Sequence, residues 1–448
     1  MKFDMVIQGA NVVFEDGVCC CDVAVKDEKI AAILRCGTKA EALKTLDGTG
    51  RYLMPGGIDT HTHLSEPGLS DSEDVWHGTR VAASGGYTTI MDMPNTNPPV
   101  KDAATFALKA DAYTRSAHVD SVLWGSSLPG RTNYIQELKK LGCPAFKAFI
   151  SDAGPAFPSS DSMALLEGME ATKQVNAVFA VHAEDPDILK PYRKKYEKEN
   201  WSLALHEKSR PWFAELAGIA KTLACAKATG CPVHICHTSI PEGVDMIEAA
   251  RRDGVDVTVE TCPHYLLFDV ESVAGTGTYS LICPPIRAKE RVEKLWKQIA
   301  EGKIDYMGTD HCPYTGVEKH PQNLWDAPGG SPSLDVAIPA ILEEGIKRRG
   351  LTFPQMSAFL AGNAAKRFGI YPRKGVIRVG ADADLMLVDM DCEWIYHREN
   401  SFAKEKDSGF PYENRKLTCR IDTTIVRGTI VYQNGRIHVS PGFGKIVR

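Results

Sequence analysis

The sequence lacks the features that mark membrane, secreted or nucleic-acid-binding proteins. No run reaches the ~18 consecutive apolar residues of a membrane span, and the N-terminal segment MKFDMVIQGA lacks the apolar core and cleavage site of a signal peptide. Basic residues are not in excess, because 52 Lys and Arg stand against 57 Asp and Glu. We therefore expect a cytoplasmic protein that acts on a small molecule, with neither nucleic acid nor a membrane as a partner.

The 13 cysteines form no disulfide framework or zinc-ribbon pattern. Cys19, Cys20 and Cys21 are adjacent in a strand-like run, in which successive side chains point to opposite faces. Such a run prevents the three thiols from sharing one tetrahedral metal ion. We expect reduced thiols, and these three as small buried apolar side chains.

The middle of the 448-residue chain contains an alternation of strand and helix patterns. Apolar and β-branched runs predict eight strands, at residues 57–63, 88–94, 119–126, 145–151, 178–184, 232–239, 257–264 and 305–311. Helical spacing occurs between them, as in residues 74–86, 133–142, 162–175, 242–254 and 290–302. This order predicts the α/β class and a (β/α)8 TIM-type barrel, although a doubly wound sheet has the same alternation and stays open as an alternative.

The two ends of the chain have a different pattern. Residues 1–54 and 373–448 consist of short strand-like runs joined by Gly, Asp and Asn turns. We expect both ends to form one small β-sandwich domain beside a barrel domain of residues 55–372. The sequence contains no internal repeat or low-complexity segment that would suggest another division.

Six polar residues lie at or near the carboxyl ends of predicted strands: His61, His63, Lys147, His182, His237 and Asp310. In a barrel, catalytic groups gather at these ends. His61 and His63 point the same way, because strand side chains repeat every two residues, so both imidazoles can reach one cation. Each residue alone has an ordinary alternative, such as a helix N-cap for Asp310. His234, three residues before His237, is expected on the opposite face, either behind the ligands or in the core. The joint pattern predicts a metal site.

Lys147 lies within the apolar strand AFKAFIS. An unpaired ammonium is costly in such a position. The side chain could extend its charge to the barrel mouth. Alternatively, its neutral amine reacts with carbon dioxide, and the resulting carbamate can bridge two metal ions. The second interpretation converts a buried cation into an anionic ligand.

A series of motifs spans almost the whole chain, in the order PGGIDTHTHLSEPG, FKAF, VHAE, HICHTS, ETCPHYL, PPIR, GTDHCP, GNAAKRFG, KGVIRVGADADL and TIVRGTIVY. In this series the chain resembles the amidohydrolase superfamily, in the cyclic-amide hydrolase branch of allantoinases, dihydropyrimidinases (hydantoinases) and dihydroorotases. The resemblance implies a barrel with two metal ions, usually Zn²⁺, and a homotetramer or dimer. It implies that His61, His63 and Asp310 hold the more buried ion, that His182 and His237 hold the other, and that carboxylated Lys147 joins them.

The implied chemistry is hydrolysis of a cyclic amide. Two cations lower the pKa of a bridging water, so that hydroxide attacks the ring carbonyl at neutral pH. Asp310 acts as general base toward this water and as general acid toward the departing ring nitrogen. Nitrogen and oxygen ligands suit zinc, and also manganese, cobalt or nickel.

Ser65 bears on which ring is opened. Dihydroorotases have an arginine at this position and commonly a histidine at the position of Tyr314, and both pair with the substrate carboxylate. Without them a carboxylate would lose its partners on binding. A serine followed by Glu66-Pro67-Gly68 resembles allantoinases, so we expect conversion of allantoin to allantoate. A hydantoinase or dihydropyrimidinase, which DHCPY resembles, is the alternative, and a dihydroorotase is less favoured.

The expected substrate contacts are the side chains of Ser65 and Asn95 and backbone groups around Cys283, Gly329 and Gly330. The glycines have the alternative of only shaping a turn. Two other classes of protein are weighed against a binuclear hydrolase. A non-catalytic scaffold homologue would lack some of the six ligands, and a mononuclear deaminase on the same fold would leave Lys147 without a role.

Overall fold

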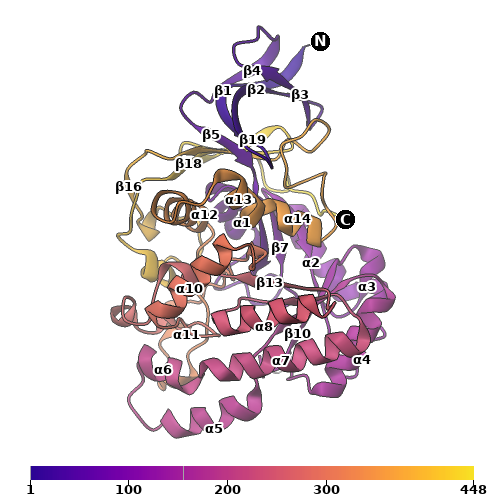
Figure 1. The fold of residues 1–448 in the computed structure, drawn as a ribbon, viewed down its shortest axis with the longest axis vertical. Helices are drawn as coiled ribbons and strands as arrows, with labels where there is room; N and C mark the ends of the chain where they lie inside the picture. Colours follow the sequence, from indigo (N-terminus) through magenta and orange to yellow (C-terminus); the bar gives the residue numbers. More distant parts are fainter. Residues whose placement is uncertain (1, 155) are drawn as a thin grey trace.

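Eight parallel strands form the centre of the molecule in the computed structural model, which describes residues 2–154 and 156–448 (Figure 1). Strand pairing is parallel from β6 to β8 and from β9 (Gly125–Ser126) to β14. A parallel bridge between Thr62 and His311 joins the two ends of this series and closes the ring. The eight strands are β6 (Gly57–Thr62), β7 (Tyr87–Asp92), β8 (Asp120–Leu123), β10 (Ala145–Phe149), β11 (Val178–His182), β12 (Val233–Ile235), β13 (Val257–Thr261) and β14 (Tyr306–Met307).

The predicted (β/α)8 barrel is therefore confirmed, and the doubly wound sheet is not what forms. Each observed strand lies within or overlaps its predicted range, but most are shorter. The predicted strand 119–126 is divided at Trp124 into β8 and β9. The interior of the barrel is filled by side chains such as Met91, Trp124 and Tyr306, so its lower end is a packed core rather than a channel.

Helices cover the outside of the barrel. All five predicted helical segments form helices, because their apolar residues recur at helical spacing: α10 buries Val292, Leu295, Trp296 and Ile299 on one side. Among the described helices, none combines the length and apolar character needed to cross a bilayer. The main helices are α1 (Val75–Ser84), α2 (Ala103–Ser116), α3 (Ile135–Leu141), α4 (Ser162–Gln174), α5 (Pro186–Tyr196), α6 (Leu203–Ser209), α7 (Trp212–Thr229), α8 (Pro241–Arg252) and α10 (Lys289–Ala300).

Strands from both ends of the chain form one sheet above the barrel (Figure 1). Its order is β20-β19-β18-β15-β5-β1-β2-β3, and β4 pairs beside β1. The sheet encloses its own apolar core, which includes Ile7, Val23, Leu53, Leu387 and Ile425, as expected for a β-sandwich built from both termini. The strands are β1 (Phe3–Val13), β2 (Val18–Lys26), β3 (Lys29–Arg35), β4 (Ala42–Asp47), β5 (Tyr52–Pro55), β15 (Leu385–Asp389), β18 (Arg420–Val426), β19 (Thr429–Gln433) and β20 (Arg436–Ile437).

The expectation that Cys19, Cys20 and Cys21 are all buried is wrong. Cys21 is buried, but Cys19 and Cys20 are exposed, as is Val18 before them. The reason is that β3 ends at Arg35, opposite Cys21, so Cys19 and Cys20 extend past the end of β3.

Candidate metal centre

The six predicted ligands come from the strands whose carboxyl ends face the barrel mouth. His61 is on β6 and His63 follows it, Lys147 is in β10, and His182 ends β11. His237 and Asp310 follow β12 and β14, respectively. Three of the imidazoles are neighbours in space: the ring centres of His61 and His237 are 5.1 Å apart, and those of His182 and His237 are 4.7 Å apart.

His61, His63 and Asp310 form the first group. Asp310 Oδ1 lies 3.4 Å from His61 Nε2 and 3.2 Å from His63 Nε2, and one ligand atom from each residue lies within 4.8 Å of the others. Burial favours the neutral form of Asp310, but the charge of His61 and a hydrogen bond with His63 hold the pKa of this carboxyl below its usual value. Two imidazoles and a carboxylate so placed are a suitable donor set for a divalent cation such as zinc.

His182 and His237 form the second group. His182 Nδ1 lies 3.1 Å from His237 Nε2, and His182 Nε2 lies 2.8 Å from Glu184 Oε2. The buried Glu184 is held by Arg210, whose Nε lies 3.1 Å from Oε1. Glu184 can therefore accept the Nε2 proton of His182, which leaves Nδ1 free to act as a ligand beside His237.

Lys147 lies between these groups without a polar partner. Its side chain is fully buried, and no hydrogen-bonding group approaches Nζ anywhere in residues 2–154 and 156–448. Burial and the charge of Lys147 together oppose protonation of His237, whose pKa lies well below its usual value. His237 Nδ1 also lacks a partner among the described residues. Buried nitrogen atoms without a hydrogen-bond partner are rare. Their presence here fits a site that binds cations and in which Lys147 is carboxylated.

The backbone is strained at three residues of this region. His237, Asp310 and Ser65 have φ angles of 34°, 49° and 61°, in the left-handed region that side chains other than glycine seldom adopt. Each such residue costs about 1–3 kcal/mol, and it persists only where the surrounding structure holds it. Two of the three are predicted metal ligands and the third is the predicted specificity residue.

Two carboxylates behind the ligands were missed by the sequence analysis. Glu260 on β13 lies between two histidines, with Oε1 2.5 Å from His61 Nδ1 and Oε2 3.2 Å from His234 Nε2. Asp59 accepts hydrogen bonds from the backbone N–H groups of His61 and Thr309. Both acids lie on barrel strands, within the quoted motifs ETCPHYL and GIDTHTH. Their place on strands that carry or adjoin the candidate ligands could have identified them from the sequence. His234 contacts Glu260 behind the ligands, which is one of the two roles expected for it.

The predicted substrate residues lie around the mouth but differ in what surrounds them. Ser65 is half-buried and begins a turn, since its carbonyl accepts from Leu69 N–H. Asn95 is half-buried, and its Oδ1 is buried without a hydrogen-bond partner in the described parts of the chain. An unused acceptor of this kind is suited to a ligand N–H group.

Cys283 and the two glycines form one packed corner. A Cβ atom at Gly329 would lie 2.9 Å from Cys283 Sγ, and Gly330 N–H donates to the carbonyl of Leu281. The buried Lys319 donates to the carbonyl of Gly330 at 2.6 Å. The two glycines therefore allow the chain to pack closely against Cys283 and Lys319.

A cavity of about 420 Å³ lies beside this corner. Its walls combine apolar and polar groups, among them Ser151, Leu189, Arg210, Leu281, Cys283 and Trp325. Since Arg210 also holds Glu184, and Glu184 contacts His182, the cavity adjoins the second group of ligands. Its mixed lining is typical of small-molecule sites.

Comparisons with known proteins point to one family. Residues 52–431 match the sequence model of the Amidohydrolase family. An allantoinase of Rubrobacter xylanophilus is 38% identical over 452 aligned positions, which cover 100% of this chain and 98% of the relative. An allantoinase of Salmonella newport is 34% identical, with 96% of each chain covered.

Among solved structures, the L-hydantoinase (dihydropyrimidinase) of Arthrobacter aurescens superposes with a TM-score of 0.96 at 32% identity, covering 99% of both chains. The dihydropyrimidinase of Brevibacillus agri superposes with a TM-score of 0.91 at 27% identity, covering 99% of this chain and 98% of the neighbour. The resemblance inferred from the motifs is thus confirmed over the full length. This chain belongs to the amidohydrolase family.

Proposed function

We propose that this chain is a metal-dependent hydrolase that opens the hydantoin ring of allantoin and releases allantoate. The observation that carries the reaction class is the grouping of His61, His63 and Asp310 beside His182 and His237, around a buried lysine that has no described partner. The choice of ring is supported by full-length similarity to relatives named allantoinase.

The metal assignment follows from the two groups of ligands. His61, His63 and Asp310 would hold the more buried ion, and His182 and His237 the other. The Lys147 amine would add carbon dioxide and lose a proton, and the two carbamate oxygens would then contact both ions. This change removes the cost of an unpaired buried ammonium. Zinc is the expected metal, and manganese, cobalt and nickel accept the same nitrogen and oxygen donors.

Asp310 has the central role among the protein groups. When bound, the cations would supply an acidified water and polarise the ring carbonyl. Asp310 would accept a proton from the attacking water and deliver it to the ring nitrogen, which is otherwise a poor leaving group. The depressed pKa of this carboxyl suits the first of these steps, because the group is ionised when water arrives. Glu260 and Glu184 would hold His61 and His182 in their ligand orientations.

The substrate is proposed to be an uncharged ring. Ser65 and Tyr314 occupy positions at which a carboxylate-binding protein would need cations. The free acceptor Oδ1 of Asn95 suits a ring or ureido N–H group, and backbone groups near Cys283, Gly329 and Gly330 would contact the ring amides. The cavity bounded by Arg210 and Cys283 has room for a substituent on the ring.

A hydantoinase or dihydropyrimidinase is the second candidate, because the superposition with the L-hydantoinase covers almost the whole chain. A dihydroorotase is less favoured for lack of the two cations. A non-catalytic scaffold conflicts with the complete set of ligand residues. We also propose a cytoplasmic homotetramer or dimer, with residues 1–54 and 373–448 as one domain and residues 55–372 as the other.

A substrate panel tests the proposal. Zinc-loaded protein with bicarbonate is given allantoin, hydantoin, a 5-substituted hydantoin, dihydrouracil or dihydroorotate, and the same panel is run with Asp310→Asn to remove background hydrolysis. We expect fast turnover of allantoin. A preference for the 5-substituted hydantoin or dihydrouracil would favour the second candidate, and turnover of dihydroorotate would overturn the Ser65 argument. Absence of turnover together with absence of bound metal would support the scaffold.

A further inference from the structure

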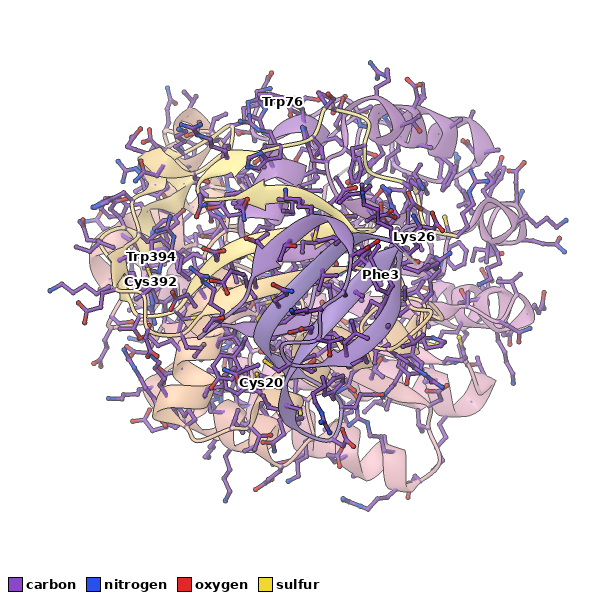
Figure 2. All side chains as sticks on the ribbon, turned by 90° about the horizontal axis from the view of Figure 1, so that it is seen from above. Phe3, Cys20, Lys26, Trp76, Cys392 and Trp394 are labelled. Carbon is purple, nitrogen blue, oxygen red and sulfur yellow. The ribbon has the colours of Figure 1, made fainter. Side chains whose placement is uncertain are left out.

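The open end of the β2–β3 hairpin carries two thiols that face each other. In this antiparallel pair Asp22 lies opposite Leu34 and Cys21 lies opposite Arg35. Cys20 precedes Cys21 on β2, and Cys36 follows Arg35 in the turn after β3, so these two residues lie next to the last pair of the hairpin. Both side chains are exposed, and Figure 2 shows Cys20 at the rim of the terminal sheet.

The two thiols lie close to each other, because each is adjacent to a residue of the pair formed by Cys21 and Arg35. A hydrogen bond between the Cys36 and Cys20 thiols raises the pKa of Cys36 above its usual value. Directly opposed residues of antiparallel strands have Cα atoms about 4.5–5.5 Å apart, which lies within the range of about 4.4–6.8 Å seen across disulfides. A bond between the two sulfurs therefore requires little movement of either strand.

The buried carboxylate of Asp22 fixes this arrangement. It accepts hydrogen bonds from Gly9 N–H at 2.8 Å and from Gly37 N–H at 3.1 Å. Gly37 directly follows Cys36 and has a φ of 80°, which turns the chain back toward Asp22. Cys36 is thereby held beside Cys20, and the contact does not depend on a freely moving loop.

The opposite end of the hairpin is anchored by ion pairs. Glu28, in the turn between β2 and β3, lies 3.2 Å from Arg427 and 2.9 Å from Lys445. Strand β3 is the outermost strand of the sheet, so its far end, near Cys36, has a neighbour on one side only. A covalent link at Cys20 and Cys36 would secure the end that the ion pairs leave free.

We propose that Cys20 and Cys36 form a redox modification site, at which a peroxide converts the two thiols into an intramolecular disulfide. One sulfur attacks the peroxide, breaks its O–O bond, and becomes a sulfenic acid with release of water or an alcohol. The other sulfur then attacks the sulfenic sulfur and displaces water. In sum, the thiols lose two protons and two electrons, and the peroxide gains them. Excess small-molecule thiol reverses the reaction by exchange.

Cys19 provides a matched control, because it is adjacent to Cys20 and equally exposed but points to the opposite face of β2. The full-length protein is reduced, treated with hydrogen peroxide, alkylated and digested with trypsin. Cleavage after Lys2, Lys26, Arg35 and Lys39 places the two thiols on separate peptides, 3–26 and 36–39. We expect these peptides to be joined, with a mass lower than their sum by two hydrogen atoms.

Three substitutions decide which thiols are used. The joined peptide should persist in Cys19→Ser and disappear in Cys20→Ser and Cys36→Ser. In the oxidised wild-type protein, backbone amides of β3 should also exchange hydrogen more slowly than in the reduced protein. Separate alkylation of Cys20 and Cys36 after oxidation would overturn the proposal, as would a link through Cys19 or between two copies of the chain. Allantoin turnover should be unchanged, so this test is independent of the proposed function.

Discussion

Two buried lysines of this protein have opposite surroundings. Lys147, in strand β10 of the barrel, has no hydrogen-bond partner among the described residues. Lys374 lies near the start of β8, where Nζ is 2.8 Å from Asp120 and 3.4 Å from Asp382 and also contacts Asp384. Both side chains are almost completely inaccessible to solvent.

The difference separates a functional site from a structural one. Burial alone would lower the pKa of Lys374, but Asp384 and Asp120 raise it above its usual value, so its charge is stabilised by the fold itself. Lys147 has no carboxylate within hydrogen-bonding distance among the described residues, and its Nζ lies 5.1 Å from the centre of the Phe149 ring. Folds rarely tolerate an unpaired buried ammonium, so its persistence points to a group added after folding. The same residue type is thus proposed to serve catalysis at one end of the barrel, whereas at the other end it is paired with carboxylates.

Replacement of Lys147 should have the largest effect on activity. We expect Lys147→Ala to lower kcat/KM for allantoin by roughly 10,000-fold or more, or over ~5 kcal/mol, because the group that joins the two metal ions is lost. The free energy of unfolding should fall only by the cost of the cavity that the buried side chain leaves, because no described hydrogen bond of Lys147 is removed. Activity and urea denaturation, measured on the same preparation, check both parts.

Chemical rescue provides the control for this variant. Short carboxylic acids such as acetate or propionate should enter the space left by Lys147→Ala and restore part of the activity together with the second metal ion. Wild-type activity in the variant would contradict the bridging role. Loss of activity with two metal ions still bound would limit Lys147 to a role in the reaction itself.

Replacement of Lys374 should have the opposite signature. Lys374→Met leaves the buried Asp384 without its cation and leaves Asp120 with Arg427 alone, so we expect the free energy of unfolding to fall by about 3–5 kcal/mol while kcat/KM is unchanged at low temperature. Lys26→Met is the matched control, because Lys26, which is labelled in Figure 2, pairs with Asp4 at the surface, and exposed pairs contribute little to stability. Similar losses in the two variants would remove the contrast between buried and exposed pairs.

The sequence predicted the barrel and its mouth better than the details behind them. Strand–helix alternation and strand-end histidines depend on local patterns, which a single sequence displays directly. The burial of Cys19 and Cys20 was predicted wrongly, because the end of the sandwich core is set by the pairing of β2 with β1 and β3. The pairing brings together residues that are distant in the sequence, and a local sequence pattern does not reveal it.

The same limit explains why Glu260 was missed. It lies 199 positions from His61 in the sequence, yet their side chains are in hydrogen-bonding contact. No spacing rule connects two residues on different barrel strands, whereas His61 and His63 are connected by the period of one strand. The candidate ligands could therefore be proposed from the sequence, whereas the carboxylates beside them became visible only in the closed barrel.

Replacement of Glu260 should have the smallest effect of the three. Glu260 extends the comparison of the two lysines, because it is a buried charged group that lies in the candidate site and yet has hydrogen-bond partners. It can accept the Nδ1 proton of His61, which leaves Nε2 facing Asp310 as a ligand atom. We expect Glu260→Gln to weaken metal binding about 10–100-fold, measured by competition with a chromogenic chelator. The amide still accepts a hydrogen bond but no longer supplies negative charge to the imidazole.

His234→Gln is the matched control, because it changes the contact on the other side of Glu260 and should leave metal affinity near that of the wild type. Equal loss in both variants would mean that Glu260 acts through the packing of the whole cluster rather than through His61.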